Sequence, residues 1–334
     1  MRLEWIDICK AIAIFAMVFC HVGLELPSQN AGFVDWIHLW HMPIFFILSG
    51  MVLNPSKYMG WSNFSVFISN RFKTLIVPYF IFGTFCTTFG YMVSKISGFG
   101  RNFTVNEILT AFIINNECIP YGGIQWFLTA LFLGEVIFVI TANVIGTKRK
   151  TIILYMLFWI VGFLFIDFVD VSLPFSLLPA IFAVPFLAMG FLFKEEIKEC
   201  TFSKMWLLLS VIILVSLFFV DGLHVNMRTS AYVPMYSVVI GGVTSLLIIF
   251  IVKNYESAFI KLRVYPYIKE TGRNTLIILL LNSAIRKILL AAVHLQNPYL
   301  LFFAQLIATF IVIGIILALS RIVNKYCPQI LGKF

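Results

Sequence analysis

The first apolar stretch of the chain carries an acid, a base and an imidazole on one helical face. At 100° per residue, Lys10 and His21 differ by about 20° around a helix axis, and Asp7 and His21 by about 40°. Such side chains cost about 2.5 to 3.5 kcal/mol each at the centre of a bilayer, so each needs a partner or a function. Asp7 and Lys10 therefore form either a surface ion pair or part of a site. His21 is either a hydrogen-bonded core residue or a base.

Two more histidines follow in the second apolar stretch. His38 and His41 lie on one helical face, at the depth expected for His21. Neutral imidazole is the natural general base near pH 7, and three imidazoles could also bind a metal. Asp35 lies nearby in the sequence, but no carboxylate or thiolate is evident as the further ligand. We therefore expect general-base chemistry and no metal.

The composition places these residues in a membrane protein. Of 334 residues, 61% are hydrophobic and 12% are charged, and the mean hydropathy is +0.98. A soluble domain is about a quarter charged, so these polar side chains are too few to cover a water-exposed surface. Six scattered cysteines indicate neither a disulfide framework nor a zinc site. The net charge of +9 comes from small groups between apolar runs, which indicates membrane topology rather than nucleic-acid binding.

Long apolar runs predict an all-α integral membrane protein, a polytopic bundle of about ten transmembrane helices, with a single domain over 1–334. The expected spans are 6–24, 37–53, 74–94, 124–145, 151–168, 173–193, 204–221, 232–252, 274–293 and 298–320. Lys and Arg are concentrated by roughly four to one on one side of this arrangement, which predicts that both termini are cytoplasmic. The outer segment 95–124 is long enough to form a lid or a binding loop.

Four further residues each have two interpretations. Arg71 and Lys73 either bind phosphate or only set the topology of the third span. Glu135, inside the fourth span, is either a substrate-binding carboxylate or the partner of a buried cation. Trp126 either stacks on a sugar ring or belongs to an interfacial aromatic belt.

Four motifs follow one another along about 40% of the chain. They are Asp7-x-x-Lys10 leading to His21, the stretch His41-Met-Pro-Ile-Phe-Phe-Ile-Leu-Ser49-Gly50, the stretch Arg71-Phe-Lys73-Thr74-Leu-Ile-Val-Pro78-Tyr79, and the stretch Trp126-Phe-Leu-Thr-Ala-Leu-Phe132. Together they resemble the acyltransferase-3 family of integral membrane acyltransferases, most closely its fucose 4-O-acetylase-like branch. Two positions depart from the family pattern: Thr74 stands where Arg or Lys is frequent, and Asn282 stands where a similar stretch usually closes with His.

The resemblance implies transfer of an acyl group, most often acetyl from acetyl-CoA, to a hydroxyl of a cell-surface glycan. It implies that His21 is the essential base and that Lys10 and the basic cluster are important. We assign catalysis to His21, His41, Asp7 and Lys10, donor binding to Arg71, Lys73 and Ser49, and acceptor binding to His38, Trp126, Glu135 and Asn282.

We thus expect a multi-pass O-acetyltransferase of the bacterial plasma membrane. Acetyl-CoA is the expected donor, and a cell-wall, capsular or exopolysaccharide is the expected acceptor. The expected partners are the glycan acceptor and the lipid bilayer, with no nucleic acid, and the chain is either a monomer or a homo-oligomer. The alternative is a proton-coupled transporter or flippase of glycans or lipids, with His21, His41 and Glu135 as a proton relay. The lack of an inverted repeat in the sequence weighs against that alternative.

Overall fold

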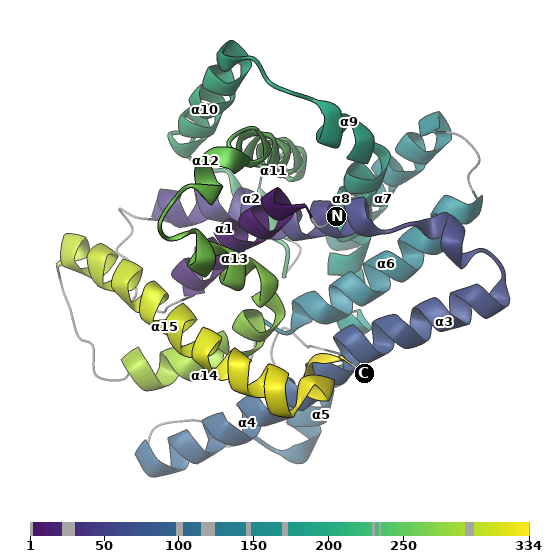
Figure 1. Cartoon of the computed structure of the whole chain (residues 1–334). Coiled ribbons are helices and arrows are strands. Elements are labelled where there is room, and N and C mark those ends of the chain that lie inside the picture. Colours follow the sequence, from purple (N-terminus) through teal and green to yellow (C-terminus); the bar gives the residue numbers. More distant parts are fainter. Residues whose placement is uncertain are drawn as a thin grey trace.

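The computed structural model of the chain is almost entirely helical (Figure 1). It describes residues 3–21, 31–97, 103–114, 124–144, 148–168, 173–228, 231–233, 235–290 and 297–333. The helices of the first half are α1 (Glu4–His21), α2 (Ala31–Val52), α3 (Trp61–Arg71), α4 (Val77–Ser97), α5 (Val105–Ile113), α6 (Trp126–Val144) and α7 (Lys148–Phe168). Those of the second half are α8 (Leu177–Leu192), α9 (Lys194–Glu199), α10 (Lys204–Phe218), α11 (Ser237–Asn254), α12 (Glu256–Ile260), α13 (Tyr265–Arg273), α14 (Thr275–Leu290) and α15 (Pro298–Tyr326).

A helix occupies the position of each predicted span. Within the described residues, five helices are long and apolar enough to cross a membrane: Trp61–Val93, Trp126–Val144, Pro174–Leu192, Ser237–Asn254 and Tyr299–Tyr326. Three shorter apolar helices lie within α7, α10 and α14. The all-α membrane class is therefore confirmed, whereas ten spans and cytoplasmic termini remain predictions.

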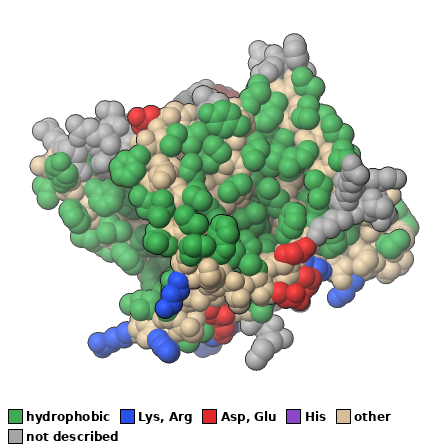
Figure 2. Space-filling view, turned by 90° about the horizontal axis from the view of Figure 1, so that it is seen from above, with side chains coloured by type: hydrophobic (Ala, Val, Ile, Leu, Met, Phe, Trp, Pro, Cys, Tyr) green, Lys and Arg blue, Asp and Glu red, His purple; other side chains and the backbone are tan. Residues whose placement is uncertain are grey.

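The surface has the polarity of a membrane protein. Many large hydrophobic side chains on α7, α10 and α15 are exposed. The face in Figure 2 is mainly hydrophobic, and most of its Lys, Arg, Asp and Glu side chains gather toward the lower edge. Because exposed apolar side chains are favourable in lipid and unfavourable in water, this face is suited to the hydrocarbon region.

Close packing of α2 on α8 depends on two glycines. A Cβ atom at Gly50 would overlap the carbonyl oxygen of Leu187, and one at Gly190 would overlap the carbonyl oxygen of Ile47. The backbones of the two helices can approach this closely only because both positions lack a side chain. This contact holds α2, which carries two of the histidines, against the centre of the bundle.

The helix of the third motif begins earlier than the predicted span. α3 and α4 are joined by a π-helical segment, Phe72–Ile76, so the helix is continuous from Trp61 to Val93. A π-turn inserts an extra residue into the helix and rotates the side chains that follow it relative to those before it. The π-turn begins directly after Arg71, so it affects the direction in which the side chain of Lys73 points relative to that of Arg71.

The only strands in the described part of the chain form a two-stranded hairpin between α10 and α11. β1 (His224–Asn226) pairs in antiparallel register with β2 (Ala231–Val233), with Val225 opposite Tyr232. The ring of Tyr232 lies 4.5 Å from that of Phe182 in α8, measured between centroids. The hairpin is thereby anchored on the helical core.

Candidate functional site

The carboxyl end of α1 and the first half of α2 bring the three histidines together. His21 is the last residue of α1, and His38 and His41 lie one turn apart in α2. The ring centroids of His21 and His38 are 6.3 Å apart, and those of His38 and His41 are 5.2 Å apart. His41 is buried, whereas His21 and His38 are half-buried. The arrangement offers adjacent imidazoles that differ in their burial.

The hydrogen bond of His41 determines its tautomer. Its Nδ1 lies 2.9 Å from the carbonyl oxygen of Ile37. A carbonyl oxygen only accepts hydrogen bonds, so the neutral ring carries its proton on Nδ1. Nε2 of His41 therefore keeps its lone pair and can accept a hydrogen bond from a hydroxyl.

Polar side chains from α14 and α15 surround the same end of α1. Arg286 donates a hydrogen bond from Nη1 to the carbonyl oxygen of His21, and Gln305 donates one from Nε2 to that of Phe19. Asn282 is fully buried, and its Nδ2 lies 3.9 Å from the sulfur of Met17. Its Oδ1 has no hydrogen-bond partner among the described residues.

Sequence reasoning missed Arg286 and Gln305 as neighbours of the histidines. For Arg286, the available signal is its spacing of four residues from Asn282, which puts both side chains on one face of α14. Gln305 is a lone amide in an apolar helix, and such a residue usually faces the interior of a bundle.

Two ion pairs join the amino end of α1 to α13. Asp7 is buried, and its Oδ2 lies 3.3 Å from Nε of Arg273 in α13. Nζ of Lys269 donates to Oε1 of Glu4 over 2.6 Å. The sequence left Asp7 and Lys10 either as an ion pair or as part of a site, and the structure adds an ion pair between Asp7 and Arg273, 266 positions later. Lys10 is half-buried on the same face of α1.

A further ion pair joins Glu270 in α13, which lies outside the candidate spans, to Arg321 in α15. Nε and Nη2 of Arg321 donate to the two carboxylate oxygens of Glu270 over 2.8 and 2.9 Å. These hydrogen bonds hold the pKa of Glu270 below its usual value. Because α13 contacts both α1 and α15, it links these two helices beside the amino end of α1.

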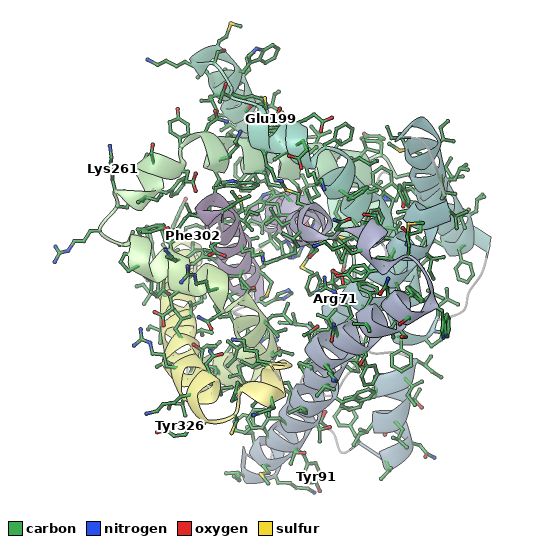
Figure 3. The ribbon with its side chains drawn as sticks, turned by 45° about the vertical axis from the view of Figure 1, so that its right-hand side comes forward. Arg71, Tyr91, Glu199, Lys261, Phe302 and Tyr326 are labelled. Carbon is green, nitrogen blue, oxygen red and sulfur yellow. The ribbon has the colours of Figure 1, made fainter. Side chains whose placement is uncertain are left out.

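The third cluster joins the basic motif to α6. Nε of Arg71, labelled in Figure 3, lies 2.8 Å from Oε2 of Glu135. The side chain of Glu135 is 2% exposed and that of Arg71 is 30% exposed. The guanidinium also lies over the ring of Phe67, 5.8 Å from its centroid. Of the two interpretations of Glu135, the structure thus favours the partner of a cation.

Three predicted residues remain, namely Lys73, Ser49 and Trp126. Lys73 is exposed, two residues after Arg71, and Ser49 is half-buried in α2. Trp126 is buried at the start of α6, and its neighbour Phe127 packs on rings of α2. Burial at this position does not fit the exposed belt residue that was one of its interpretations.

The predicted site residues therefore fall into three groups rather than one. Among the described residues, no three His, Cys, Asp or Glu side chains are grouped as metal ligands. Lys10 and His21 are eleven residues apart, which corresponds to about 16 Å along the helix axis. A reaction that uses both ends of α1 thus needs a substrate of that length or longer.

Comparisons with known proteins reveal one similarity. A family model described as an acyltransferase domain matches residues 3–319, which is nearly the whole chain. No curated protein and no solved structure shows significant similarity to the chain. The family match covers α1 to α15 and includes all three groups of site residues.

Proposed function

The chain belongs to the acyltransferase-3 family, and we propose that it transfers an acetyl group from acetyl-CoA to a hydroxyl of a cell-surface polysaccharide. Family membership makes it a membrane acyltransferase. The observation that carries the finer proposal is the histidine group, with ring centroids 5.2 and 6.3 Å apart at one end of α1. The same membership favours a transferase over the transporter considered from the sequence.

In the proposed reaction, His21 is the general base. Its imidazole takes the proton of the acceptor hydroxyl while the oxygen attacks the carbonyl carbon of the thioester. The carbon–sulfur bond then breaks, and the imidazolium returns the proton to the CoA thiolate. A base of this kind typically contributes about 10² to 10⁴ in rate. His41 positions the hydroxyl through its unprotonated Nε2.

We further propose that donor and acceptor approach from opposite sides. Arg71 and Lys73 bind the phosphates of CoA at the cytoplasmic face, because guanidinium and ammonium groups form strong charge-assisted bonds with phosphate. The pantetheine arm then extends along α1 past Lys10 and brings the thioester to His21. The separation of about 16 Å along α1 supports this scheme, because it is about half the thickness of the hydrocarbon core.

The role of His21 is tested with purified protein in detergent. His21→Ala should retain the wild-type melting temperature and elution volume, while acceptor-dependent release of CoA falls at least about a hundredfold. Near-normal turnover would contradict the assignment. Loss of both activity and melting temperature would be resolved with His21→Asn, which keeps hydrogen bonding but lacks basicity.

The sidedness is tested in sealed vesicles of known orientation. Acetyl-CoA supplied only at the cytoplasmic face should acetylate an impermeant oligosaccharide supplied only at the other face. Product that forms only when both substrates share the cytoplasmic face would refute the two-sided scheme, while leaving acetyl transfer itself intact. CoA release without any acetylated oligosaccharide would contradict the proposal that a polysaccharide is the acetyl acceptor.

A further inference from the structure

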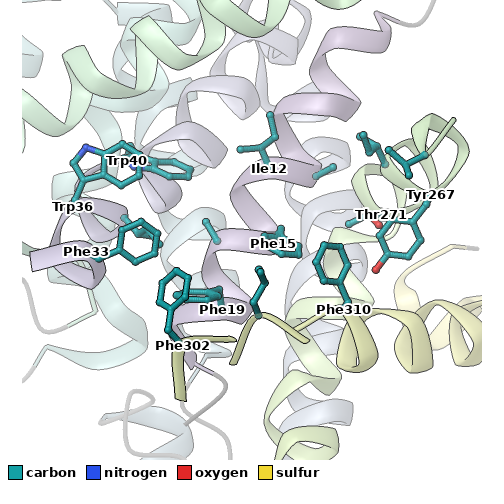
Figure 4. Close-up of a pocket in the computed structure, with 16 residues that line it drawn as sticks. Ile12, Phe15, Phe19, Phe33, Trp36, Trp40, Tyr267, Thr271, Phe302 and Phe310 are labelled. Atoms are coloured by element: carbon teal, nitrogen blue, oxygen red, sulfur yellow. The ribbon is translucent and has the colours of Figure 1, made fainter. Parts of the chain in front are cut away.

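A large apolar groove lies outside the site groups described above. Its volume is about 750 Å³, within the range of about 300–1,000 Å³ that ligand sites occupy. α1, α2, α13 and α15 form its walls, with Ile12, Phe15, Trp40, Tyr267 and Phe310 among the lining residues (Figure 4). Groove residues from the ends of the sequence meet here because α15 packs on α1.

The groove is on the far side of α1 from His21. At 100° per residue, Ile12 and His21 differ by about 180° around the helix axis, and Phe19 and His21 by about 160°. The proposed base thus faces away from the groove. A chain bound here would not bring a thioester or a sugar hydroxyl to His21.

The length of the groove corresponds to one membrane leaflet. Its lining on α1 runs from Ala11 to Phe19, about 12 Å along the axis, and half of the hydrocarbon core is about 15 Å. At one end, the ring of Phe19 packs against Phe33 and Phe302, with centroids 5.6 and 5.5 Å away. At the other end lie the hydroxyl-bearing residues Tyr267 and Thr271 (Figure 4).

The hydroxyl-bearing end leads to a basic turn. Lys261 and Arg263 are exposed immediately before Val264, which itself lines the groove. Exposed Ile260 and Leu262 alternate with these cations, and Lys261 extends away from the ribbon in Figure 3. Basic side chains between exposed apolar ones are typical of a segment at the level of lipid headgroups.

We propose that this groove binds an acyl chain of an anionic glycerophospholipid whose phosphate is held by Lys261 and Arg263. An acyl chain needs no hydrogen-bond partner, whereas a peptide segment would bring backbone polar groups against apolar walls. The basic turn supplies the complementary charge at the end where the headgroup of that leaflet lies. The bound chain fills the space beside α1, α13 and α15 and supports the helix that carries His21.

The binding is tested by quenching of tryptophan fluorescence, because Trp36 and Trp40 line the groove. The protein is reconstituted in phosphatidylcholine vesicles that contain a small fraction of phosphatidylglycerol or phosphatidylcholine with brominated acyl chains. We expect brominated phosphatidylglycerol to quench at a lower mole fraction, by about fivefold for each basic residue that binds it. Replacing both tryptophans with Phe should remove this selective component.

Two variants identify the groove as the origin of the selectivity. Lys261→Gln with Arg263→Gln should abolish the preference for the anionic headgroup, and Ala16→Leu should lower quenching by both lipids because it fills the groove. The matched control, Lys57→Gln with Lys204→Gln, removes the same charge from exposed positions elsewhere and should keep the preference.

Four results would overturn the proposal. The first is equal quenching by the two brominated lipids, which indicates bulk lipid contact only. The second is a preference that survives loss of Lys261 and Arg263 or is equally lost in the control. The third is displacement of the brominated lipid by long-chain acyl-CoA, which would assign the groove to the donor. The fourth is a groove protected from all lipids in a dimer, which would assign it to a second copy of the chain.

Discussion

Replacing Arg71 and replacing Glu135, the two members of one ion pair, should lower the free energy of unfolding by different amounts. Removing one partner of a buried ion pair costs about 3–5 kcal/mol, because the other charge remains buried, whereas an exposed pair contributes about 0.2–1 kcal/mol. The pair lies between these limits, since Glu135 is 2% exposed and Arg71 is 30% exposed. The loss in the free energy of unfolding from each substitution therefore depends on how deeply the charge that remains is buried.

Arg71→Gln leaves the carboxylate of Glu135 in the interior, so we expect a loss of about 3 kcal/mol in the free energy of unfolding. Glu135→Gln leaves a guanidinium that can reach solvent, so we expect a loss of about 1 kcal/mol. The double variant leaves no stranded charge. It should lose only about 2 kcal/mol, which gives a coupling of about 2 kcal/mol between the two positions.

The assay is equilibrium unfolding in mixed micelles, with Lys57→Gln as an exposed control that should stay within about 0.5 kcal/mol of wild type. Equal losses for the two single variants, or strictly additive losses in the double variant, would refute the reasoning. Kinetics then separate support of the fold from donor binding. Arg71→Gln should raise the apparent KM for acetyl-CoA, while Glu135→Gln, which keeps the cation, should change it much less.

The remaining predictions concern the histidines, the helix crossing and α13. His41→Asn should retain far more CoA-releasing activity than His21→Asn, since its proposed role needs hydrogen bonding rather than basicity; equal losses would indicate a shared role. Gly190→Ala should lower the melting temperature, whereas Gly314→Ala should not, because a Cβ at Gly314 meets no atom within 4 Å; similar melting temperatures would contradict the close crossing of α2 and α8. Glu270 has a lowered pKa, so its stabilisation is complete above its unfolded pKa of about 4.3 and is lost as the pH falls through the lower folded value. Melting curves from pH 3 to 6 should therefore show a smaller acid loss in Glu270→Gln, and an unchanged profile would rule out this contribution.

Local patterns were enough to predict the helices and the grouping of the three histidines. A helix needs only a run of apolar residues and its own hydrogen bonds, so α1, α2, α6 and α8 appear where their apolar runs lie. The face shared by Lys10 and His21 likewise follows from the repeat of a single helix. The sequence therefore predicts which residues of a single helix lie within one turn of each other or on the same face.

The membrane class, the positions of the helices and the polar face of α1 follow from local sequence patterns. Contacts between side chains of different helices arise on folding: Arg273 with Asp7, Glu135 with Arg71, and Arg286 with the carbonyl of His21. The positions joined by these contacts lie 64 to 266 residues apart or are linked through a backbone atom. No periodicity along one helix encodes such contacts, because they depend on how neighbouring helices cross and rotate against one another.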